Sequence, residues 1–354
     1  MSGGKTAVLY KELIEAIASG LYVPLGRIPS ERTLMAKYNV SRETVRNALT
    51  MLRKDGLVHA RPGCGTFVSA EGWKLPTIGV LVSGCRYTEI FRCIGNSICS
   101  LAKDSNLNVI FEDASHFGAE KALSLAMDFA RRLVAAKVAG VIVQPLEFIS
   151  DEQERNLELM AIFDEAGIPA VLLDCGIAGH DGRCAYDRIG IDNFAAGRLV
   201  GRHLAERGAK CVLCCASPFR PESVRDRFVG IRAACPNVLE LEASPYDTKS
   251  LRHVFKEHPE VDAVVCQNDV YAIGVMASLR KMKRKIPSDV MVAGFDGLNL
   301  SKLCTPTLTT ISQPVKDIAV YAIECLQRRM EGGAIAPAVI NLPAPLVVQK
   351  TTVP

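Results

Sequence analysis

The 354-residue chain lacks the long apolar segments that mark membrane and exported proteins. No run approaches the roughly 18 apolar residues of a membrane span, and the N-terminal segment MSGGKTAVLYKELIEAIASG contains no apolar stretch of signal-peptide length. From these absences we expect a soluble, cytoplasmic protein with no membrane partner.

The sequence also lacks the short motifs of common catalytic sites. It contains no phosphate-binding loop of the G-x-x-x-x-G-K-[ST] type and no G-x-S-x-G nucleophile elbow, and its six histidines are scattered, none paired with a plausible nucleophile. We therefore expect no catalytic residue and no cofactor.

The thirteen cysteines are dispersed, which is not typical of a zinc site. The single C-x-x-C, from Cys211 to Cys214, lies in the apolar run KCVLCCAS, which predicts a buried strand, and a second ligand pair is missing. We expect no metal and interpret the thiols as reduced, buried, small apolar side chains.

The positive charge that the chain does carry is concentrated at one end. Residues 1–70 contain ten Lys and Arg against five Asp and Glu, whereas the remaining 284 residues carry a net charge of −1. A basic segment joined to a nearly neutral body is the charge distribution expected of a phosphate-binding surface.

This basic segment also contains the most informative pattern of the chain, which runs from residue 28 to residue 68. Ser30 and Ser41 stand where a side-chain oxygen would cap a helix, and Glu31 and Glu43 follow in the first turns. The pattern therefore predicts two short helices, and the segments 57–61 and 66–68 around Pro-Gly-Cys-Gly predict a hairpin after them.

The second of these helices is predicted to have a packing face and an exposed face. The apolar arc, about 100° wide at helical spacing, contains Val45, Ala48, Leu49 and Leu52. The residues that point away from it are Glu43, Asn47 and Thr50, with Arg46 at their flank. Each piece alone is common on ordinary proteins, but their order predicts a winged helix-turn-helix.

Residues 10–68 closely resemble the DNA-binding domain of the GntR family, through YKELIEAIASGLY, IPSER, VSRETVRNAL and GLVHARPGCGTFV. The resemblance implies DNA contacts by Arg32, Arg42, Arg46, Gly63 and Gly65. Ser41, Glu43 and Thr44 lie among them and are also candidates, because hydroxyl and backbone N–H groups fix the register on phosphates. Cys64 occupies a position where we expect a polar or basic residue, so Arg61 is the candidate for the charge of the wing.

From Thr77 onward, short apolar runs alternate with helical patterns. Continuous apolar runs are typical of parallel strands covered on both faces, and strand–helix alternation predicts a doubly wound α/β fold. About seven such runs suggest two lobes: TIGVLVSG, LNVIFE, GVIVQPL, PAVLLD, CVLCCA, DAVVCQND and VMVAGFD.

Polar residues at the ends of these runs are candidate ligand-binding residues, because ligands of open α/β sheets bind at the carboxyl ends of strands. Asn268 and Asp296 end two of the runs, and a third run opens a loop that leads to Arg227. A single such residue more often caps the next helix, which is what we expect of Asp269. The convergence of three strand ends favours a site.

The region from about Thr77 to the C-terminus resembles the effector-binding region of the LacI/GalR family, itself similar to periplasmic sugar-binding proteins. The matching segments include GVIVQPLE, IGIDNFAAGRLVGRHLAERG, VRDRFVGIRAA, VDAVVCQNDVYAIGVMASL and IPSDVMVAGFDG. The resemblance implies effector binding by Arg227, Asn268 and Asp296, which together donate to and accept from vicinal hydroxyls. An aromatic residue of the first lobe, Tyr87 or Phe91, would cover an apolar sugar face.

The expected domains are a winged helix at residues 1–70, a linker at 71–76 and a two-lobed effector-binding and dimerisation domain at 77–354. Lobe I is expected at about 77–208 and 314–334, and lobe II at about 209–312 and 338–354. The chain would cross between lobes near 208–211, 311–315 and 333–338. Asp192 and Asn193 are further candidates for the cleft.

We hypothesise a transcriptional regulator, a repressor relieved by a small-molecule effector, that binds a pseudo-palindromic operator as a homodimer. The combination of a GntR-type winged helix with a LacI-type effector-binding domain resembles the arabinose-responsive regulators of the GntR family. Arabinose is therefore one candidate effector. Alternatives from other classes are a transport solute-binding protein, an enzyme, and a dimeric DNA binder that responds to no ligand.

Overall fold

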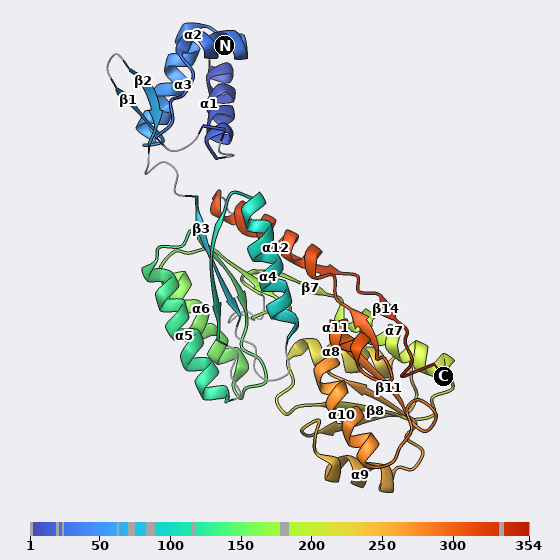
Figure 1. Ribbon diagram of the computed structural model, residues 1–354. Helices are drawn as coiled ribbons and strands as arrows, with labels where there is room; N and C mark the ends of the chain where they lie inside the picture. The colour runs from blue at the N-terminus through green and yellow to red at the C-terminus, as the bar shows by residue number, and fades with distance from the viewer. Residues whose placement is uncertain are drawn as a thin grey trace. The chain divides into compact units, whose positions relative to one another are not determined.

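Figure 1 shows the computed structural model, which describes residues 3–18, 21–22, 25–61, 64–69, 75–82, 89–114, 118–177, 184–332 and 336–353. The chain forms two compact units, one of residues 1–77 with 103–108 and one of residues 78–102 with 109–354. Within the described ranges, none of the helices is both long and apolar enough to traverse a lipid bilayer.

The first unit is a winged helix-turn-helix, as the sequence predicts. Its elements are α1 (Gly3–Ala18), α2 (Glu31–Tyr38), α3 (Arg42–Lys54), β1 (Val58–Arg61) and β2 (Gly65–Val68). Ser30 accepts a hydrogen bond from the N–H of Thr33 and Ser41 accepts one from the N–H of Thr44, both at 3.2 Å. The two predicted caps therefore begin α2 and α3.

The predicted packing face of α3 forms the core of this unit. Val45, Ala48, Leu49 and Leu52 are at most 2% exposed, and they lie in one apolar cluster with residues of α1 and the hairpin. The β1–β2 hairpin is antiparallel, with Val58 opposite Val68 and Arg61 opposite Gly65. The predicted outward positions Glu43, Asn47 and Thr50 are all exposed.

The second unit contains two six-stranded sheets, which define lobe I and lobe II. In spatial order, lobe I contains β13 (Val339–Leu342), β7 (Asp187–Ile191), β6 (Ala170–Leu173), β5 (Gly140–Gln144), β3 (Thr77–Val82) and β4 (Asn108–Asp113). Lobe II contains β14 (Leu346–Val347), β12 (Thr309–Ser312), β11 (Met291–Asp296), β10 (Ala263–Cys266), β8 (Val212–Ala216) and β9 (Val238–Glu242). The predicted doubly wound architecture is confirmed, and each of the seven predicted runs contains a strand.

Helices cover both sheets, so that the strands are buried as the apolar runs require. The helices of lobe I are α4 (Ile90–Asp104), α5 (Ala119–Ala135), α6 (Glu152–Glu165) and α12 (Val315–Met330), with α5 and α6 on the opposite side from α4 and α12 (Figure 1). Those of lobe II are α7 (Asn193–Glu206), α8 (Glu222–Arg232), α9 (Thr248–Glu257), α10 (Asp269–Lys281) and α11 (Asn299–Leu303).

The chain crosses between the lobes three times, but two crossings differ from the predicted positions. Helix α7 packs along α8 of lobe II, so the first crossing lies between β7 and α7, at residues 191–193, and not at 208–211. Strand β13 pairs in parallel with β7 of lobe I, which places the third crossing at residues 342–346 and not at 333–338. The second crossing, between β12 and α12, agrees with the prediction.

The described cysteines follow the expectation of buried thiols in most cases. Seven are buried, and of the C-x-x-C pair Cys211 directly precedes β8 and Cys214 lies within it. Cys64 at the hairpin tip and Cys93 on α4 are exposed exceptions. Burial raises the pKa of the Cys214 and Cys215 thiols, which keeps them protonated.

Candidate functional sites

The exposed face of α3 carries two arginines that share one carboxylate of α2. The Nε atoms of Arg42 and Arg46 donate to Glu31, at 2.9 Å and 3.4 Å, and both guanidinium side chains remain about two-thirds exposed. The hydrogen bond from Arg42 holds the pKa of Glu31 below its usual value. Because the contacts use Nε, the terminal nitrogens remain available for a phosphate or a guanine edge.

The other predicted residues of this surface differ in their accessibility. Arg32, Ser41 and Glu43 are exposed. Thr44 is only 6% exposed, and its hydroxyl lies 2.9 Å from that of Ser41. The structure therefore places Thr44 in the helix cap, and a DNA contact by its side chain would require this capping pair to rearrange.

The hairpin contributes a second group of cations. Arg61 is exposed, and its guanidinium lies 4.9 Å from the centre of the Phe67 ring. Gly65 has a φ of +115°, and a Cβ there would stand 2.7 Å from Nε of Arg27, so this turn requires glycine. Arg27 is a cation of the wing that was not selected from the sequence. Gly63 lies outside the described residues.

In the second unit, one cavity between the lobes brings together four of the five predicted effector residues. Phe91 of α4 reaches it from lobe I, and Arg227, Asn268 and Asp296 reach it from lobe II. The fifth, Tyr87, lies outside the described residues. The space in the cavity is about 20 Å³, which is about the room of one water molecule. The lobes are therefore closed on each other around this site.

Arg227 of α8 is bonded to the first residue of α7 and to Gln267, which follows β10. It is 4% exposed, its Nε donates to Asn193 Oδ1 at 2.8 Å, and one terminal nitrogen donates to the carbonyl oxygen of Gln267 at 2.7 Å. Asn193 therefore lies beside the cavity as expected. Asp192 caps α7 by accepting from the N–H of Ala195.

Asp296 is the last residue of β11 and Asn268 follows the end of β10 by two residues, but the two side chains make different contacts. Asn268 Oδ1 accepts from the N–H of Tyr271 at 2.9 Å and caps α10. Asp269, which we expected to be the cap, is instead buried and accepts from the hydroxyl of Thr310 and the N–H of Leu298. Asp269 thus joins the start of α10 to β12 and to the segment that begins α11.

Asp296 is a buried carboxyl group, and one of its oxygens has no partner in the part of the chain that the structure describes. Its Oδ1 accepts from Gln313 at 2.9 Å, whereas Oδ2 has no hydrogen-bond partner among the described residues. Burial raises the pKa of Asp296 to about 7, against the opposing effect of Arg227. A second buried group in the same cavity, the side-chain nitrogen of Gln267, also lacks a partner there among the residues that the structure describes.

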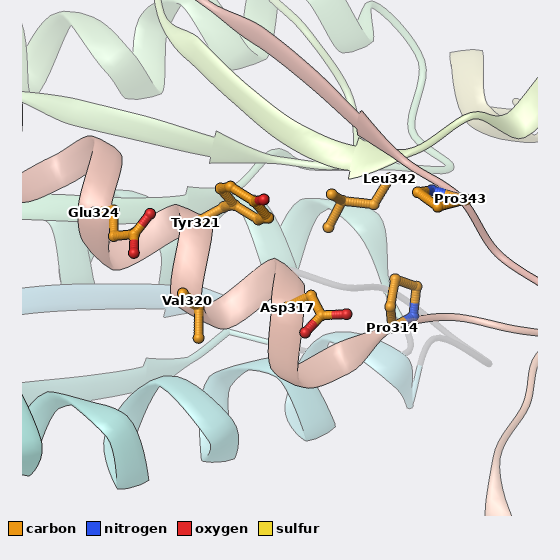
Figure 2. A pocket seen from close by; sticks show the side chains of 7 residues that line it. All are labelled: Pro314, Asp317, Val320, Tyr321, Glu324, Leu342 and Pro343. Atoms are coloured by element: carbon orange, nitrogen blue, oxygen red, sulfur yellow. The ribbon is translucent and has the colours of Figure 1, made fainter.

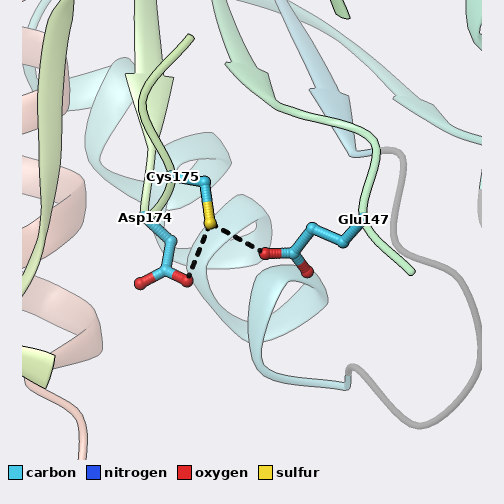
Figure 3. A group of neighbouring side chains, drawn as sticks. All are labelled: Glu147, Asp174 and Cys175. Atoms are coloured by element: carbon cyan, nitrogen blue, oxygen red, sulfur yellow. Dashed lines mark hydrogen bonds between the residues drawn. The ribbon is translucent and has the colours of Figure 1, made fainter. Parts of the chain in front are cut away.

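Three residues of the cavity region were missed in the sequence. Glu147, Asp174 and Cys175 place their ligand atoms within 4.8 Å of one another (Figure 3). The Cys175 thiol donates to Glu147 Oε1 at 3.3 Å, and it lies 3.8 Å from Asp174 Oδ2. Asp174 directly follows β6, so the strand-end rule that selected Asp296 could have found it.

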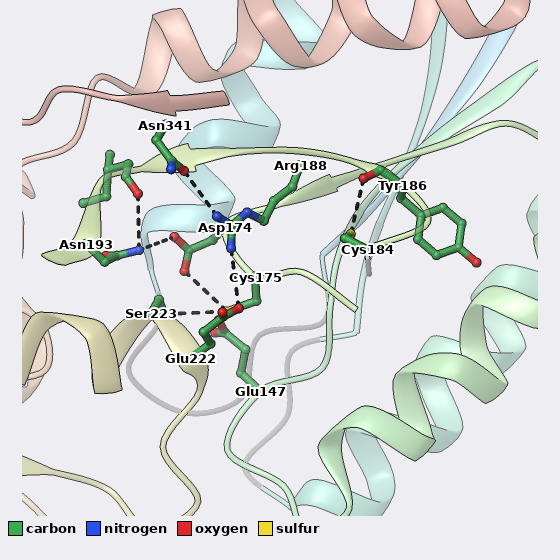
Figure 4. A network of polar contacts seen from close by, with 11 residues as sticks. Glu147, Asp174, Cys175, Cys184, Tyr186, Arg188, Asn193, Glu222, Ser223 and Asn341 are labelled. Carbon is green, nitrogen blue, oxygen red and sulfur yellow. Dashed lines mark hydrogen bonds and ion pairs between the residues drawn. The ribbon is translucent and has the colours of Figure 1, made fainter. Parts of the chain in front are cut away.

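The missed residues are connected to the interlobe network that Figure 4 shows. Asn193 donates to Asp174 Oδ1 at 3.4 Å, and Arg188 of lobe I lies 3.5 Å from Glu222 of lobe II. The Cys175 thiol also lies 3.7 Å from the hydroxyl of Ser223 on α8. Polar contacts therefore cross between the lobes on this side of the cavity.

The raised pKa of Asp296 leads to a testable dependence of stability on pH. The folded state favours the protonated form, so stability falls as the pH rises from about 4 towards 7 and changes little above that. Asp296→Asn should therefore raise the free energy of unfolding by at least about 2 kcal/mol at pH 8, since one pKa unit corresponds to about 1.4 kcal/mol. At pH 5 the gain should be much smaller. Urea unfolding at both pH values measures this, and equal gains would contradict it.

A larger hollow lies on the surface of the second unit, away from the predicted residues. It has a volume of about 400 Å³ and is formed by α12 and the end of β13, with Tyr321 and Leu342 at its centre (Figure 2). Asp317 and Glu324 also line it. None of the four candidate effector residues that the structure describes, Phe91, Arg227, Asn268 and Asp296, lines it.

Comparison with known proteins agrees with both units. The model of the gntR family of bacterial regulatory proteins matches residues 5–68, and the model of the periplasmic binding protein-like domain matches residues 202–352. The chain is 25% identical to the arabinose metabolism transcriptional repressor of Halalkalibacterium halodurans, over 97% of the chain and 95% of that protein. It is 27% identical to the ribose operon repressor of the same organism over 54% of the chain, a match that spans only 58% of that repressor.

A solved structure supports the fold of the second unit. The lac repressor dimer bound to operator and the anti-inducer ONPF superimposes with a TM-score of 0.63, covers 79% of the chain and 95% of its own, and is 22% identical. The fold and these matches define a class: a DNA-binding transcriptional regulator with a two-lobed, periplasmic binding protein-like domain.

Within that class, the chain joins a domain that matches the gntR family to one that matches the periplasmic binding protein-like domain. Both resemblances noted in the sequence are thereby confirmed. The named relatives are repressors of sugar operons.

Proposed function

We propose that the chain is a repressor that binds a pseudo-palindromic operator as a homodimer, and that a small sugar in the interlobe cavity changes its affinity for that operator. The observation that carries the proposal is that Phe91, Arg227, Asn268 and Asp296 line one cavity. We assign DNA binding to residues 1–70, a linker to 71–76, and effector binding and dimerisation to 77–354.

The closed cavity supports a mechanism based on movement of the lobes. A space of about 20 Å³ is too small for a monosaccharide, so the lobes must separate for a sugar to enter. Movement would occur about the three crossings at 191–193, 312–315 and 342–346. In a dimer such movement changes the spacing of two winged helices, and a coupling of about 1–3 kcal/mol changes operator affinity about 5- to 150-fold.

The proposal is tested by operator binding with and without candidate effectors. Operator fragments are selected from random DNA with the full chain, and affinity is then measured with arabinose, ribose, xylose and galactose. We expect at least one sugar to weaken binding at least about 5-fold, and Arg227→Ala should abolish that response. If no sugar changes the affinity for the operator, and Arg227→Ala regulates as the parent does, the result would favour a dimeric DNA binder that responds to no ligand.

The arrangement of α3 predicts which arginines determine operator affinity. Arg42→Ala and Arg46→Ala should each weaken operator binding about 5- to 150-fold, because a bidentate contact to a base contributes about 1–3 kcal/mol. Arg53→Ala is the matched control, since Arg53 is exposed in the last turn of the same helix. Fluorescence anisotropy with labelled operator measures the effect. An Arg53 variant as weak as the other two would contradict this assignment of the surface.

A further inference from the structure

Lobe II carries a concentration of positive charge that the winged helix does not explain. Residues 249–256 (KSLRHVFK) and 280–285 (RKMKRK) contain eight Lys and Arg and no Asp or Glu, although residues 71–354 together carry a net charge of −1. Arg284 is half-buried and the other seven cations are exposed. These seven are called the basic surface: Lys249, Arg252, Lys256, Arg280, Lys281, Lys283 and Lys285.

The two segments of the basic surface lie next to each other. Helices α9 and α10 pack together (Figure 1), and the guanidinium of Arg284 lies 4.9–5.1 Å class distance of 5.1 Å from the centre of the Phe255 ring. This contact brings residues 280–285 against the end of α9. Helix α10 begins beside the cavity at Asn268 and has 13 residues, so it ends about 20 Å away from it. The basic surface is therefore separate from the candidate effector site.

The cations of α9 form a row along one face of the helix. Lys249, Arg252 and Lys256 are spaced at i, i+3 and i+7, which places them on one side. Leu251 and Phe255 of the same helix are buried on the other side, in the core of lobe II. The row is about 10 Å long, a length over which duplex DNA carries about six phosphate charges.

Local stabilisation explains only part of this charge. Cations in a last turn are favoured by the helix dipole, which accounts for Lys256, Arg280 and Lys281. Lys283 and Lys285 lie beyond the end of α10, where that effect falls off.

Neighbouring carboxylates do not neutralise the basic surface either. Among the residues that the structure describes, none of its seven side chains forms an ion pair with Asp or Glu. Asp289 accepts from the backbone N–H of Lys285 and not from its ammonium group, and Glu260 pairs with His258. The surface therefore presents several like charges to solvent, which is favourable for binding a polyanion.

We propose that the basic surface binds the phosphates of double-stranded DNA without reading sequence, as a second DNA contact besides the winged helix. The chain is a DNA-binding regulator, so this surface works close to DNA. Lysine is a point charge that suits phosphates. The two segments contain none of the exposed large apolar side chains with which a helix inserts into a lipid surface. DNA is thus favoured over a membrane.

The test measures the affinity of the full chain for a labelled random-sequence duplex by fluorescence anisotropy at several salt concentrations. Each phosphate contact contributes about 0.9 to the slope of log affinity against log salt. Replacing three lysines by glutamine should therefore reduce the magnitude of that slope by about 2.7. The variant combines Lys281→Gln, Lys283→Gln and Lys285→Gln.

A matched control removes the same charge from lobe I. It combines Lys121→Gln, Lys137→Gln and Lys316→Gln, which replace exposed lysines outside the basic surface, and it should change the slope by less than about 1. Equal losses in the two triple variants would mean that net charge alone sets the affinity, which would overturn the proposal.

A second variant keeps the test decisive if the first triple does not fold. Arg252→Gln with Lys256→Gln on α9 should reduce the slope by about 1.8. An unchanged slope in the folded variants of the basic surface would overturn the proposal.

Two further measurements separate the basic surface from the winged helix and from a lipid site. The slope lost with the first triple should also be lost when Arg42→Ala and Arg46→Ala are already present, because the two surfaces bind independently. Vesicles of phosphatidylglycerol and phosphatidylcholine test the other polyanion. Vesicle binding that the triple variant abolishes, with an unchanged DNA slope, would overturn the proposal in favour of a membrane.

Discussion

Gly197→Ala is expected to lower the free energy of unfolding of the second unit by about 3 kcal/mol, which is the upper part of the range for overpacking. A Cβ at this position would stand 2.0 Å from the carbonyl oxygen of Arg227 and 2.9 Å from its Cα. These are backbone atoms, so they cannot move aside as a flexible side chain would. Helices α7 and α8 would have to separate.

The same substitution should also impair the effector response, because it displaces the residue that reaches the cavity. Helix α8 also approaches the backbone of α7 through a glycine of its own, since a Cβ at Gly230 would stand 2.2 Å from the carbonyl oxygen of Phe194. Gly230→Ala should therefore have a similar effect. In both variants Arg227 moves relative to Asn193, and its 2.8 Å hydrogen bond is lost.

The control for this prediction is a helical glycine in open space. A Cβ added to Gly4 of α1 would have no atom within 4 Å, so Gly4→Ala should leave the unfolding midpoint unchanged or raise it. Urea unfolding followed by circular dichroism measures all three variants, with the transition of the second unit followed separately. A Gly197→Ala protein with the parent's midpoint would show that the helices can separate at little cost.

The sequence could predict the part of the site that follows from local rules. Asn268 and Asp296 end apolar runs, and parallel strands bring their carboxyl ends to one edge of a sheet, so their meeting followed from the pattern. Asp174 obeys the same rule but was not selected, because the three converging strand ends that favoured a site all belong to lobe II. Glu147 lies three residues beyond the end of β5, where the rule no longer selects a residue.

Contacts between distant segments account for what the sequence could not predict. The assignment of α7 to lobe II depends on how Gly197 and Gly201 fit against α8. A pair of glycines in a helix does not indicate which helix packs against it. Strand β13 is short and mostly exposed or half-buried, so its sequence has no long apolar run from which a strand could be predicted. The outer domain limits, the DNA contacts and the effector contacts remain predictions.

One such distant contact supports the second large prediction, which concerns the ion pair between Arg329 and Asp187. Asp187 lies on β7 and is fully buried. It accepts from Arg329 Nε at 2.8 Å and Nη2 at 2.9 Å, and from the N–H of Ala338 at 2.7 Å. The pair thus joins the end of α12 to β7 and to the segment before β13.

Arg329→Met should destabilise the second unit by about 3–5 kcal/mol at pH 7, because it leaves a buried carboxylate without its cation. Methionine retains much of the apolar stem, so the loss reports mainly on the charge. Arg328→Ala is the matched control, since Arg328 is the exposed neighbour on the same helix, and it should change stability by less than about 1 kcal/mol.

The pH dependence of the same variant distinguishes a lost ion pair from lost packing. Burial alone would raise the pKa of Asp187, but the bonds from Arg329 and Ala338 outweigh it and lower that pKa. The pair therefore stabilises the parent above the unfolded pKa of about 4, and this stabilisation is lost as the pH falls through the folded value. Without Arg329, burial raises the pKa, so the deficit of the variant should shrink at pH 5 relative to pH 8. A deficit that is equal at both pH values would mean that packing, and not the buried charge, is what Arg329 contributes.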